Sequence, residues 1–117
     1  MHIEEIRTYC LEKKGTEETF PFDEVTLVFK VMGKMYALTN LDGDLSINLK
    51  CDPEKALVLR EQFPDVLPGY HMHKKHWNTI LMNGSIPSQL IRTWIDDSYN
   101  LVVSSLSRKL KEELEKL

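Results

Sequence analysis

The stretch that decides the fold is Glu24-Val-Thr-Leu-Val-Phe-Lys-Val-Met-Gly-Lys-Met-Tyr-Ala-Leu-Thr-Asn-Leu-Asp-Gly-Asp-Leu-Ser-Ile-Asn-Leu-Lys50. Apolar residues alternate with others along 25–31, and Gly33-Lys34 gives a tight reversal into residues 35–41. Asp42-Gly43 supplies the next turn, after which Leu45, Ile47 and Leu49 alternate with polar residues. This pattern predicts an antiparallel meander with one solvent-exposed face and one buried face. The buried face needs helices or a second sheet to cover it.

Helical patterns flank this meander on both sides. Residues 2–14 have apolar side chains at helical spacing, and Gly15 stands where the helix should stop. Asp52-Pro53-Glu54 combines a carboxylate cap, a proline at the first helical position and an acid in the first turn, and Pro64 ends that helix. The last helix is predicted to start near Ser85 or Pro87 and to run to the end of the chain, with residues 108–117 as a frayed tail.

Three further segments complete the expected fold. Residues 16–23 are predicted to form a loop that anchors the rings of Phe20 and Phe22, because Pro21 cannot continue a helix. Residues 64–69 are predicted to form another loop, and residues 77–82 another strand. We therefore expect one α+β domain over residues 1–117: an antiparallel sheet of about five strands, with N-terminal, middle and long C-terminal helices packed on it.

Composition limits the function classes. The chain has 117 residues, 42% of them apolar and 28% charged, and it lacks any apolar run near the roughly 20 residues of a bilayer span. The first residues resemble no secretion signal, and two cysteines far apart in sequence fit a reducing compartment, so a cytoplasmic location is expected. A net charge of −3 argues against a generic, charge-dominated nucleic-acid binder, although it permits one locally basic surface.

Seven motifs, in order along the chain, resemble the MmcQ/YjbR family of small bacterial proteins. They are Glu18–Phe22, Val28–Val31, Gly33–Met35, Leu49–Glu54, Pro68–Met72, His76–Thr79 and Asp97–Val102. Asp23 departs from the pattern, since many members have glycine there, and the charged tail after Ser107 is less typical. The resemblance implies a fold similar to that of CyaY, the bacterial frataxin homologue, and a DNA-binding role through a "double wing" surface formed by strands.

Residues 66–84 hold the strongest local basic character, with a sum of +2 and no acid. Lysines on the meander and on this segment are candidates to contact phosphates, and the rings beside them are candidates to stack on bases. The candidate nucleic-acid-binding residues are Lys30, Lys34, Lys50, Tyr70, His71, His73, Lys74, Lys75 and His76. The alternative is that Trp77 and Tyr70 anchor the core, the lysines form a solvated rim and the histidines are incidental.

Two other kinds of chemistry have weaker support. His71, His73 and His76 could converge on a metal ion, but Lys74 and Lys75 add positive charge there and no acid is near in sequence, so no metal site is expected. Cys51 precedes a helix N-terminus that could activate its thiol. Because no motif arranges a base or an oxyanion hole around it, a small buried residue at a strand end is the preferred interpretation.

On the last helix, Ser98 is expected to permit close helix-to-sheet contact, and Tyr99 to bury its ring with its hydroxyl bonded. The sequence thus predicts a non-enzymatic, monomeric protein without cofactors that binds DNA weakly and mostly through its backbone. The alternative is a protein-interaction or adaptor module that uses the same exposed face against an acidic partner.

Overall fold

The computed structural model describes residues 1–69 and 72–117. Its helices are α1 (Ile3–Leu11), α2 (Pro53–Gln62), α3 (Ser88–Ser104) and α4 (Arg108–Glu115). Its strands are β1 (Thr16–Thr19), β2 (Thr26–Val31), β3 (Lys34–Asn40), β4 (Ser46–Lys50), β5 (Val66–Pro68) and β6 (Trp77–Leu81). The strands form one antiparallel sheet in the order β1-β2-β3-β4-β6-β5. The α+β fold expected from the sequence is therefore confirmed.

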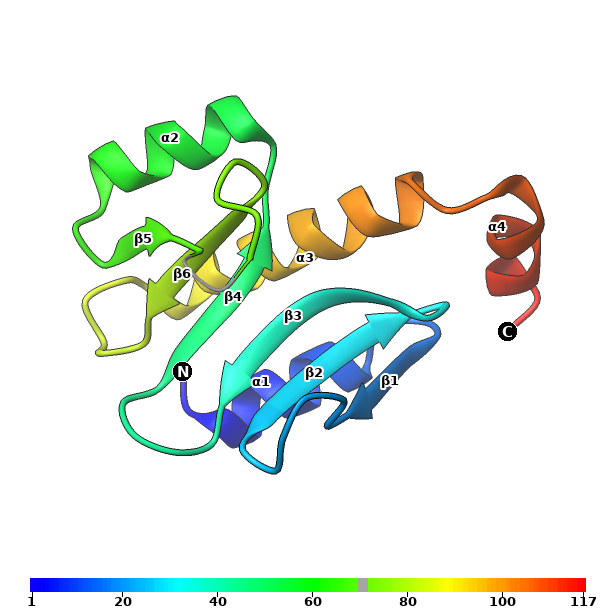
Figure 1. Ribbon diagram of the computed structural model, residues 1–117, viewed down its shortest axis with the longest axis horizontal. Helices are drawn as coiled ribbons and strands as arrows, with labels where there is room; N and C mark the ends of the chain where they lie inside the picture. Colours follow the sequence, from blue (N-terminus) through cyan, green and yellow to red (C-terminus); the bar gives the residue numbers. More distant parts are fainter. Residues whose placement is uncertain (70–71) are drawn as a thin grey trace.

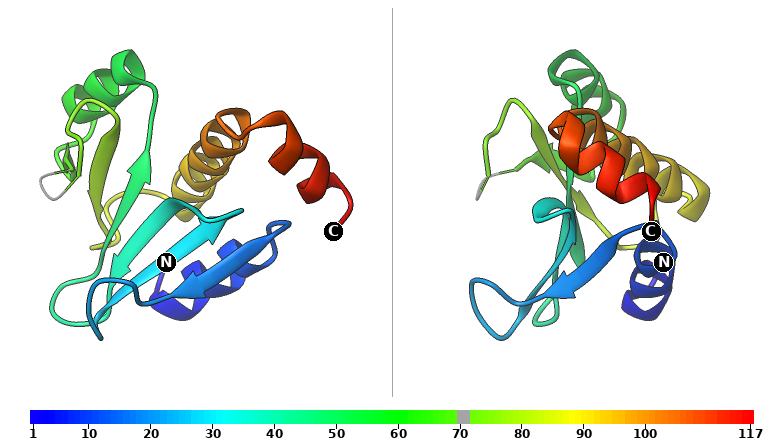
Figure 2. Two further views of the ribbon diagram at one scale, coloured as in Figure 1. Left: turned by 45° about the vertical axis from the view of Figure 1, so that its right-hand side comes forward. Right: turned by 90° about the vertical axis from the view of Figure 1, so that its right-hand side faces the viewer.

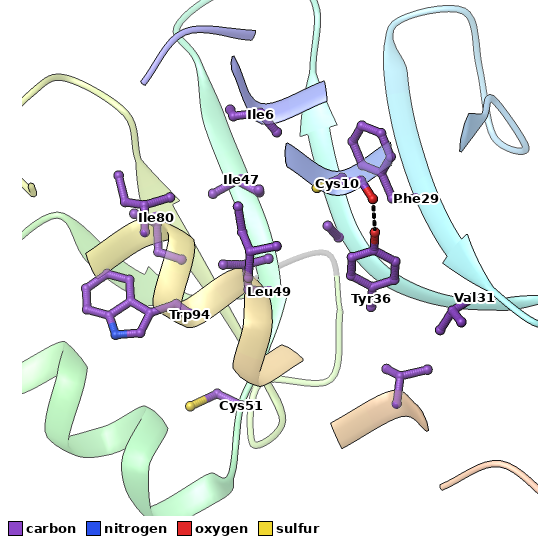
Figure 3. Close-up of a cluster of buried hydrophobic side chains, with 14 of the residues drawn as sticks. Ile6, Cys10, Phe29, Val31, Tyr36, Ile47, Leu49, Cys51, Ile80 and Trp94 are labelled. Carbon is purple, nitrogen blue, oxygen red and sulfur yellow. Dashed lines mark hydrogen bonds between the residues drawn. The ribbon is translucent and has the colours of Figure 1, made fainter. Parts of the chain in front are cut away.

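One face of the sheet carries the core. Helices α1, α2 and α3 pack on this face; α3 crosses behind β4 in Figure 1 and contacts both β3 and β4. The largest side chains that face the helices are fully buried, among them Phe29, Tyr36 and Ile47. Figure 3 shows these side chains together with Leu49, Ile80 and Trp94. The alternation of the meander predicted that Phe29, Ile47 and Leu49 would point inward, because every second residue of a strand points to the same face.

The opposite face, which we call the open face, has no helix over it in the described part of the chain. In the right-hand view of Figure 2, α1 and α3 lie on one side of the sheet, while the segments around residues 20–25 and 72–76 project on the other. The open face therefore remains available to a ligand, with loops at its margins.

The hairpin between β2 and β3 contains an irregularity that the sequence did not reveal. Met32 and Gly33 both have positive φ in the turn, as a tight primed turn requires, so the reversal lies one residue earlier than Gly33-Lys34. The register then shifts: Phe29 faces Ala37 and Lys30 faces Met35, which leaves Tyr36 as an extra residue on β3. Ser98 of α3 bonds to the main chain at this bulge, so α3 is fixed to the sheet there.

Two predicted loops each contain a short strand. Residues 16–19 pair with β2, and residues 66–68 pair with β6. β1 was missed because Thr16-Glu-Glu-Thr19 lies at the sheet edge and shows no apolar alternation. β5 was missed because it has three residues and ends in a proline, which is tolerated at an edge.

The C-terminal helix is not continuous, contrary to the prediction. α3 ends at Ser104, and α4 begins after Ser107, whose side chain caps the amide of Leu110 at 3.2 Å. Residues 108–115 are not a frayed tail, because Leu114 is 6% exposed and belongs to the main core cluster. Leu114 of α4 packs beside Gly15 and in the main core cluster, so α4 does not extend away from the sheet.

Candidate nucleic-acid interface

A small apolar cluster lies on the open face of the sheet. Val28, Leu38 and Trp77 are buried there, and Met35 and Met72 pack against them. Trp77 is 8% exposed. The packing interpretation of Trp77 is therefore correct, and its ring is not free to stack on a base.

Lys30 and Lys50 share the open face. Their strand neighbours Phe29, Val31 and Leu49 point into the core cluster on the helix side, so both lysines point the other way. Lys30 lies opposite Met35 and Lys50 lies opposite Trp77, which are both in the open-face cluster. β2 and β4 run in the same direction and both lysines are close to the ends of these strands, so they lie toward the same end of the sheet.

Lys34 is placed differently from these two lysines. It is exposed, but it pairs with Val31, whose side chain is in the core cluster on the helix side. By register Lys34 therefore belongs to the helix-covered face, next to the β2–β3 turn. The structure does not bring it together with Lys30 and Lys50 on the open face.

Lys74 and Lys75 lie on the loop that leads into β6. Both are exposed, and with His76 they line a hollow of about 510 Å³ whose other wall is α2, including Glu54, Leu57 and Arg60. The loop therefore continues from the same end of the sheet as Lys50, because Lys50 pairs with Trp77 and the Cys51 amide donates to the His76 carbonyl oxygen at 2.7 Å. Glu54 in the same hollow offsets part of its positive charge.

Arg60 and Asn78 hold this loop in place, and sequence reasoning missed both. Arg60 donates through Nε to Asn78 Oδ1 at 2.7 Å and through Nη2 to the Lys74 carbonyl oxygen. Asn78 is 2% exposed and donates through Nδ2 to the Ala56 carbonyl oxygen at 3.4 Å. Asn78 falls inside the motif His76–Thr79, and its alternation with Trp77 was the signal that could have placed it on the helix side.

The histidine predictions have mixed outcomes. His73 is exposed and His76 is half-buried, with ring centroids 4.9 Å apart. Tyr70 and His71 lie outside the described residues, so the predictions about them remain untested. Within residues 1–69 and 72–117, no group of three or more His, Cys, Asp or Glu side chains is arranged to hold a metal ion.

Phe20 and Phe22 are not anchored as expected. Phe20 is 48% exposed and Phe22 is 63% exposed. Their loop is held by Asp23 instead, whose carboxylate accepts hydrogen bonds from the amides of Val25 and Thr26 at 2.9 and 2.7 Å. These bonds lower the pKa of Asp23, so its charge persists at neutral pH. Phe22 and Asp23 stand beside a hollow of about 530 Å³ on the open face.

Cys51 has no sign of activation. It is 8% exposed at the end of β4, and burial raises the pKa of its thiol. Cys10 is fully buried, and burial raises the pKa of its thiol to about 12. Since the thiolate is the nucleophile, this geometry agrees with the interpretation of Cys51 as a small buried residue at a strand end.

These features define a class of small α+β proteins in which helices cover one face of a single antiparallel sheet, while lysines, an exposed phenylalanine and a hollow lie on the other face. A model of the YjbR family matches residues 11–101. The chain therefore belongs to the YjbR family, as its motifs predicted.

Relatives and solved structures agree with this assignment. The chain is 40% identical to YbdF from Escherichia coli O157:H7 over 107 residues, which cover 91% of this chain and 88% of the relative. It is 33% identical to YjbR from Escherichia coli strain K12 over the full length of both chains. A Deinococcus radiodurans crystal structure with a DUF419 domain is 41% identical with a TM-score of 0.91, covering 97% of this chain and 87% of that one. A crystal structure of a Pseudomonas syringae protein has a TM-score of 0.76 at 31% identity, covering 86% of this chain and 98% of that one.

Proposed function

We propose that the protein binds DNA through the open face, weakly and mostly through the phosphate backbone. The observation that carries the proposal is that Lys30 and Lys50, twenty residues apart in sequence, share the open face at one end of the sheet. The loop with Lys74 and Lys75 adjoins that end and adds two more cations. Phosphate contacts from lysines supply sequence-independent affinity.

Weak binding follows from the charge around these lysines. Glu17 of β1 lies opposite Lys30 of β2 in the strand register. Glu54 lines the same hollow as Lys74 and Lys75. The whole chain carries a net charge of −3. Each acid near the path of the DNA reduces the gain from counterion release. Affinity should therefore be low, with a modest dependence on salt and little dependence on sequence.

The test is a fluorescence anisotropy titration of a labelled mixed-sequence duplex at low salt with a Lys30→Glu/Lys50→Glu variant. The matched control is Lys109→Glu/Lys111→Glu on α4, which changes net charge equally at exposed positions away from the open face. We expect the open-face variant to lose at least tenfold in affinity while the control loses much less. Equal losses in the two variants would reduce the interaction to net charge, and no binding by the wild type would reject the proposal.

The proposal also assigns no catalysis and a cytoplasmic location. Both cysteines are free, and burial raises the pKa of both thiols, so neither is supported as a nucleophile. Free thiols fit a reducing compartment. No helix among the described residues has the length and apolar character needed to cross a bilayer.

A second candidate function is supported by exposed apolar side chains. Phe20, Phe22, Val25 and Leu41 are each more than two-fifths exposed, and the Leu41 amide donates to the Val25 carbonyl oxygen at 2.7 Å, so the two loops meet. Such residues fit a protein-interaction module that binds an acidic, partly apolar partner through this side of the sheet. A pull-down that survives nuclease treatment and is abolished by Phe20→Ala/Phe22→Ala would favour this function over DNA binding.

A further inference from the structure

The open face carries a hollow that phosphate binding alone does not explain. It has a volume of about 530 Å³ and lies over β3 and β4, with the loop before β2 on one side and Met72 on the other. This volume falls within the range of small-molecule pockets in proteins. The side chains from these segments that matter below are Phe22, Asp23, Leu38, Asn48 and Met72.

The apolar part of the hollow suits a flat, neutral ring. Leu38 is buried at its floor, Met72 packs onto the same apolar cluster, and Phe22 stands at the wall with most of its side chain exposed. The Asp23 carboxylate fixes this loop by accepting hydrogen bonds from main-chain amides. The loop therefore keeps its conformation without burial of the Phe22 ring. The ring of Phe22 is thus presented to solvent beside an apolar floor, which is an arrangement that stacks planar groups.

The polar part of the hollow offers a side-chain amide with a hydrogen-bond donor to spare. Asn40 is fully engaged, because its side chain bonds to Asp42, Asp44 and Ser46 and orders the β3–β4 turn. Asn48 instead accepts from Thr79 Oγ1 at 2.5 Å through Oδ1, which fixes its amide, and within the described residues its Nδ2 has no acceptor. An oriented side-chain amide can pair with the edge of a base.

Charge separates this hollow from the lysines. The Asp23 carboxylate lines the wall of the hollow, and its negative charge would repel a phosphate placed inside the hollow. Lys50 is two residues from Asn48 along β4 and points to the same face, which places it about 7 Å away along the strand. A nucleotide can therefore place its base in the hollow and its phosphate toward Lys50.

We propose that the hollow beside Phe22 and Asn48 binds an unpaired nucleobase, so that the protein prefers single-stranded nucleic acid or unpaired ends over intact duplex. This inference rests on the proposed function for its phosphate contacts, but it adds a ligand class and a site. In a duplex the bases are paired and stacked, so none can enter the hollow without unpairing. In a single strand each base has a free face for Phe22 and a free edge for Asn48.

The first experiment compares DNA and RNA single strands of about 10 nucleotides with a duplex of the same length, a size within the usual range of single-strand sites. We expect the wild type to bind at least one kind of single strand about tenfold more tightly than the duplex at equal salt. Phe22→Ala should remove that preference and leave duplex binding unchanged. The control is Phe20→Ala. This substitution removes an exposed ring from the same loop, but the Phe20 ring does not line the hollow.

The second experiment separates this inference from the proposed function. Adenosine and thymidine, which carry no phosphate, are titrated into the isotope-labelled protein, and amide shifts are followed by NMR. We expect shifts at Asn48 and Phe22 that are lost in Phe22→Ala and in Asn48→Leu, with thermal melting used to confirm that both variants fold.

The outcomes are distinguishable. Equal binding of single strands and duplex, with no nucleoside shifts at the hollow, overturns the inference and leaves the phosphate contacts standing. Nucleoside shifts at the hollow without any duplex binding overturn the proposed function and support the base site. If the protein binds no nucleic acid and the nucleosides cause no amide shifts at the hollow, both the inference and the proposed function are overturned.

Discussion

The Ser98 hydroxyl of α3 donates a hydrogen bond to the Tyr36 carbonyl oxygen of β3 at 2.5 Å. The same hydroxyl accepts a hydrogen bond from the Lys50 amide of β4 at 2.8 Å. Tyr36 is the extra residue of the β-bulge, and β3 pairs with β4 only from Ala37 to Thr39. A serine on a helix thus replaces a strand partner where the sheet ladder is interrupted.

Ser98→Ala should destabilise the protein by about 2 kcal/mol, because it leaves a main-chain donor and acceptor without their partner at a fully buried site. Urea unfolding followed by circular dichroism measures the change. Ser104→Ala is the control, since Ser104 is exposed and donates only to Leu101 of its own helix. A change below about 0.5 kcal/mol for Ser98→Ala would mean that water replaces the hydroxyl without loss.

Arg60→Ala should loosen the loop before β6. The substitution removes a charge-assisted hydrogen bond to buried Asn78 and the contact to the Lys74 carbonyl oxygen, at a cost of about 1–3 kcal/mol. Hydrogen exchange should accelerate at the amides of His76 and Trp77, which both donate to the His73 carbonyl oxygen. Arg108→Ala is the control, because the Arg108 side chain is 94% exposed. It should change neither the free energy of unfolding nor the exchange rates of these two amides.

Gly15→Ala should be more destabilising than Gly43→Ala, although both glycines have φ near +75° (φ 73 and 77). A Cβ at Gly15 would lie 2.6 Å from Leu114 Cδ1, whereas a Cβ at Gly43 meets nothing within 4 Å. We expect about 1 kcal/mol for Gly43→Ala from backbone strain alone and about 2–3 kcal/mol for Gly15→Ala. Equal melting temperatures of the two variants would show that α4 does not pack against Gly15.

Stability should fall as the pH rises above about 9. Burial raises the pKa of the Cys10 thiol from an ordinary 9.0 to about 12, so between these values the folded state holds a proton that the unfolded state has lost. Unfolding then releases a proton, and the free energy of unfolding drops by about 1.4 kcal/mol per pH unit for this group. Urea unfolding of wild type and Cys10→Ala between pH 8 and about 11 measures the two slopes. The variant should have the shallower slope, and identical slopes would contradict the assignment to Cys10.

Duplex binding should show a modest salt dependence. Contacts from Lys30, Lys50, Lys74 and Lys75 predict a slope of about −3 to −4 in a plot of log K against log salt, since each neutralised phosphate contributes about −0.9. Lys30→Glu/Lys50→Glu should lower the magnitude of the slope by about 2. A slope near zero in the wild type would show that phosphates are not the main contacts.

Much of the fold could be predicted from local pattern. The alternation along residues 25–31 and 45–50 predicted β2 and β4, and Asp52-Pro53 predicted the start of α2, where the Asp52 carboxylate accepts from the Lys55 amide at 3.2 Å. The break after Ser104 was missed because apolar residues continue at helical spacing through Leu106 and Leu110, so periodicity alone gives no signal. The close helix contact of Ser98 and the bonded hydroxyl of Tyr99, which donates to the Lys14 carbonyl oxygen at 2.5 Å, were both predicted correctly.

The candidate site was less accessible to sequence reasoning. Alternation placed Lys30 and Lys50 opposite to the core residues, but it could not show that Lys34 falls on the helix-covered side, because the turn and the bulge set that register. It also could not show that Phe22 is exposed, since a ring in a loop can be anchored or presented with the same local sequence.

By itself, the sequence determined the family, most of the strands and helices, and which side chains point inward, because these depend on spacings of two to four residues along the chain. Only the tertiary structure decided which face stays open, that Tyr36 bulges against Ser98, and that Phe22, Asn48 and Met72 border one hollow. These features join segments far apart in the chain, and their geometry is fixed by packing and by hydrogen bonds between elements, which no local spacing encodes.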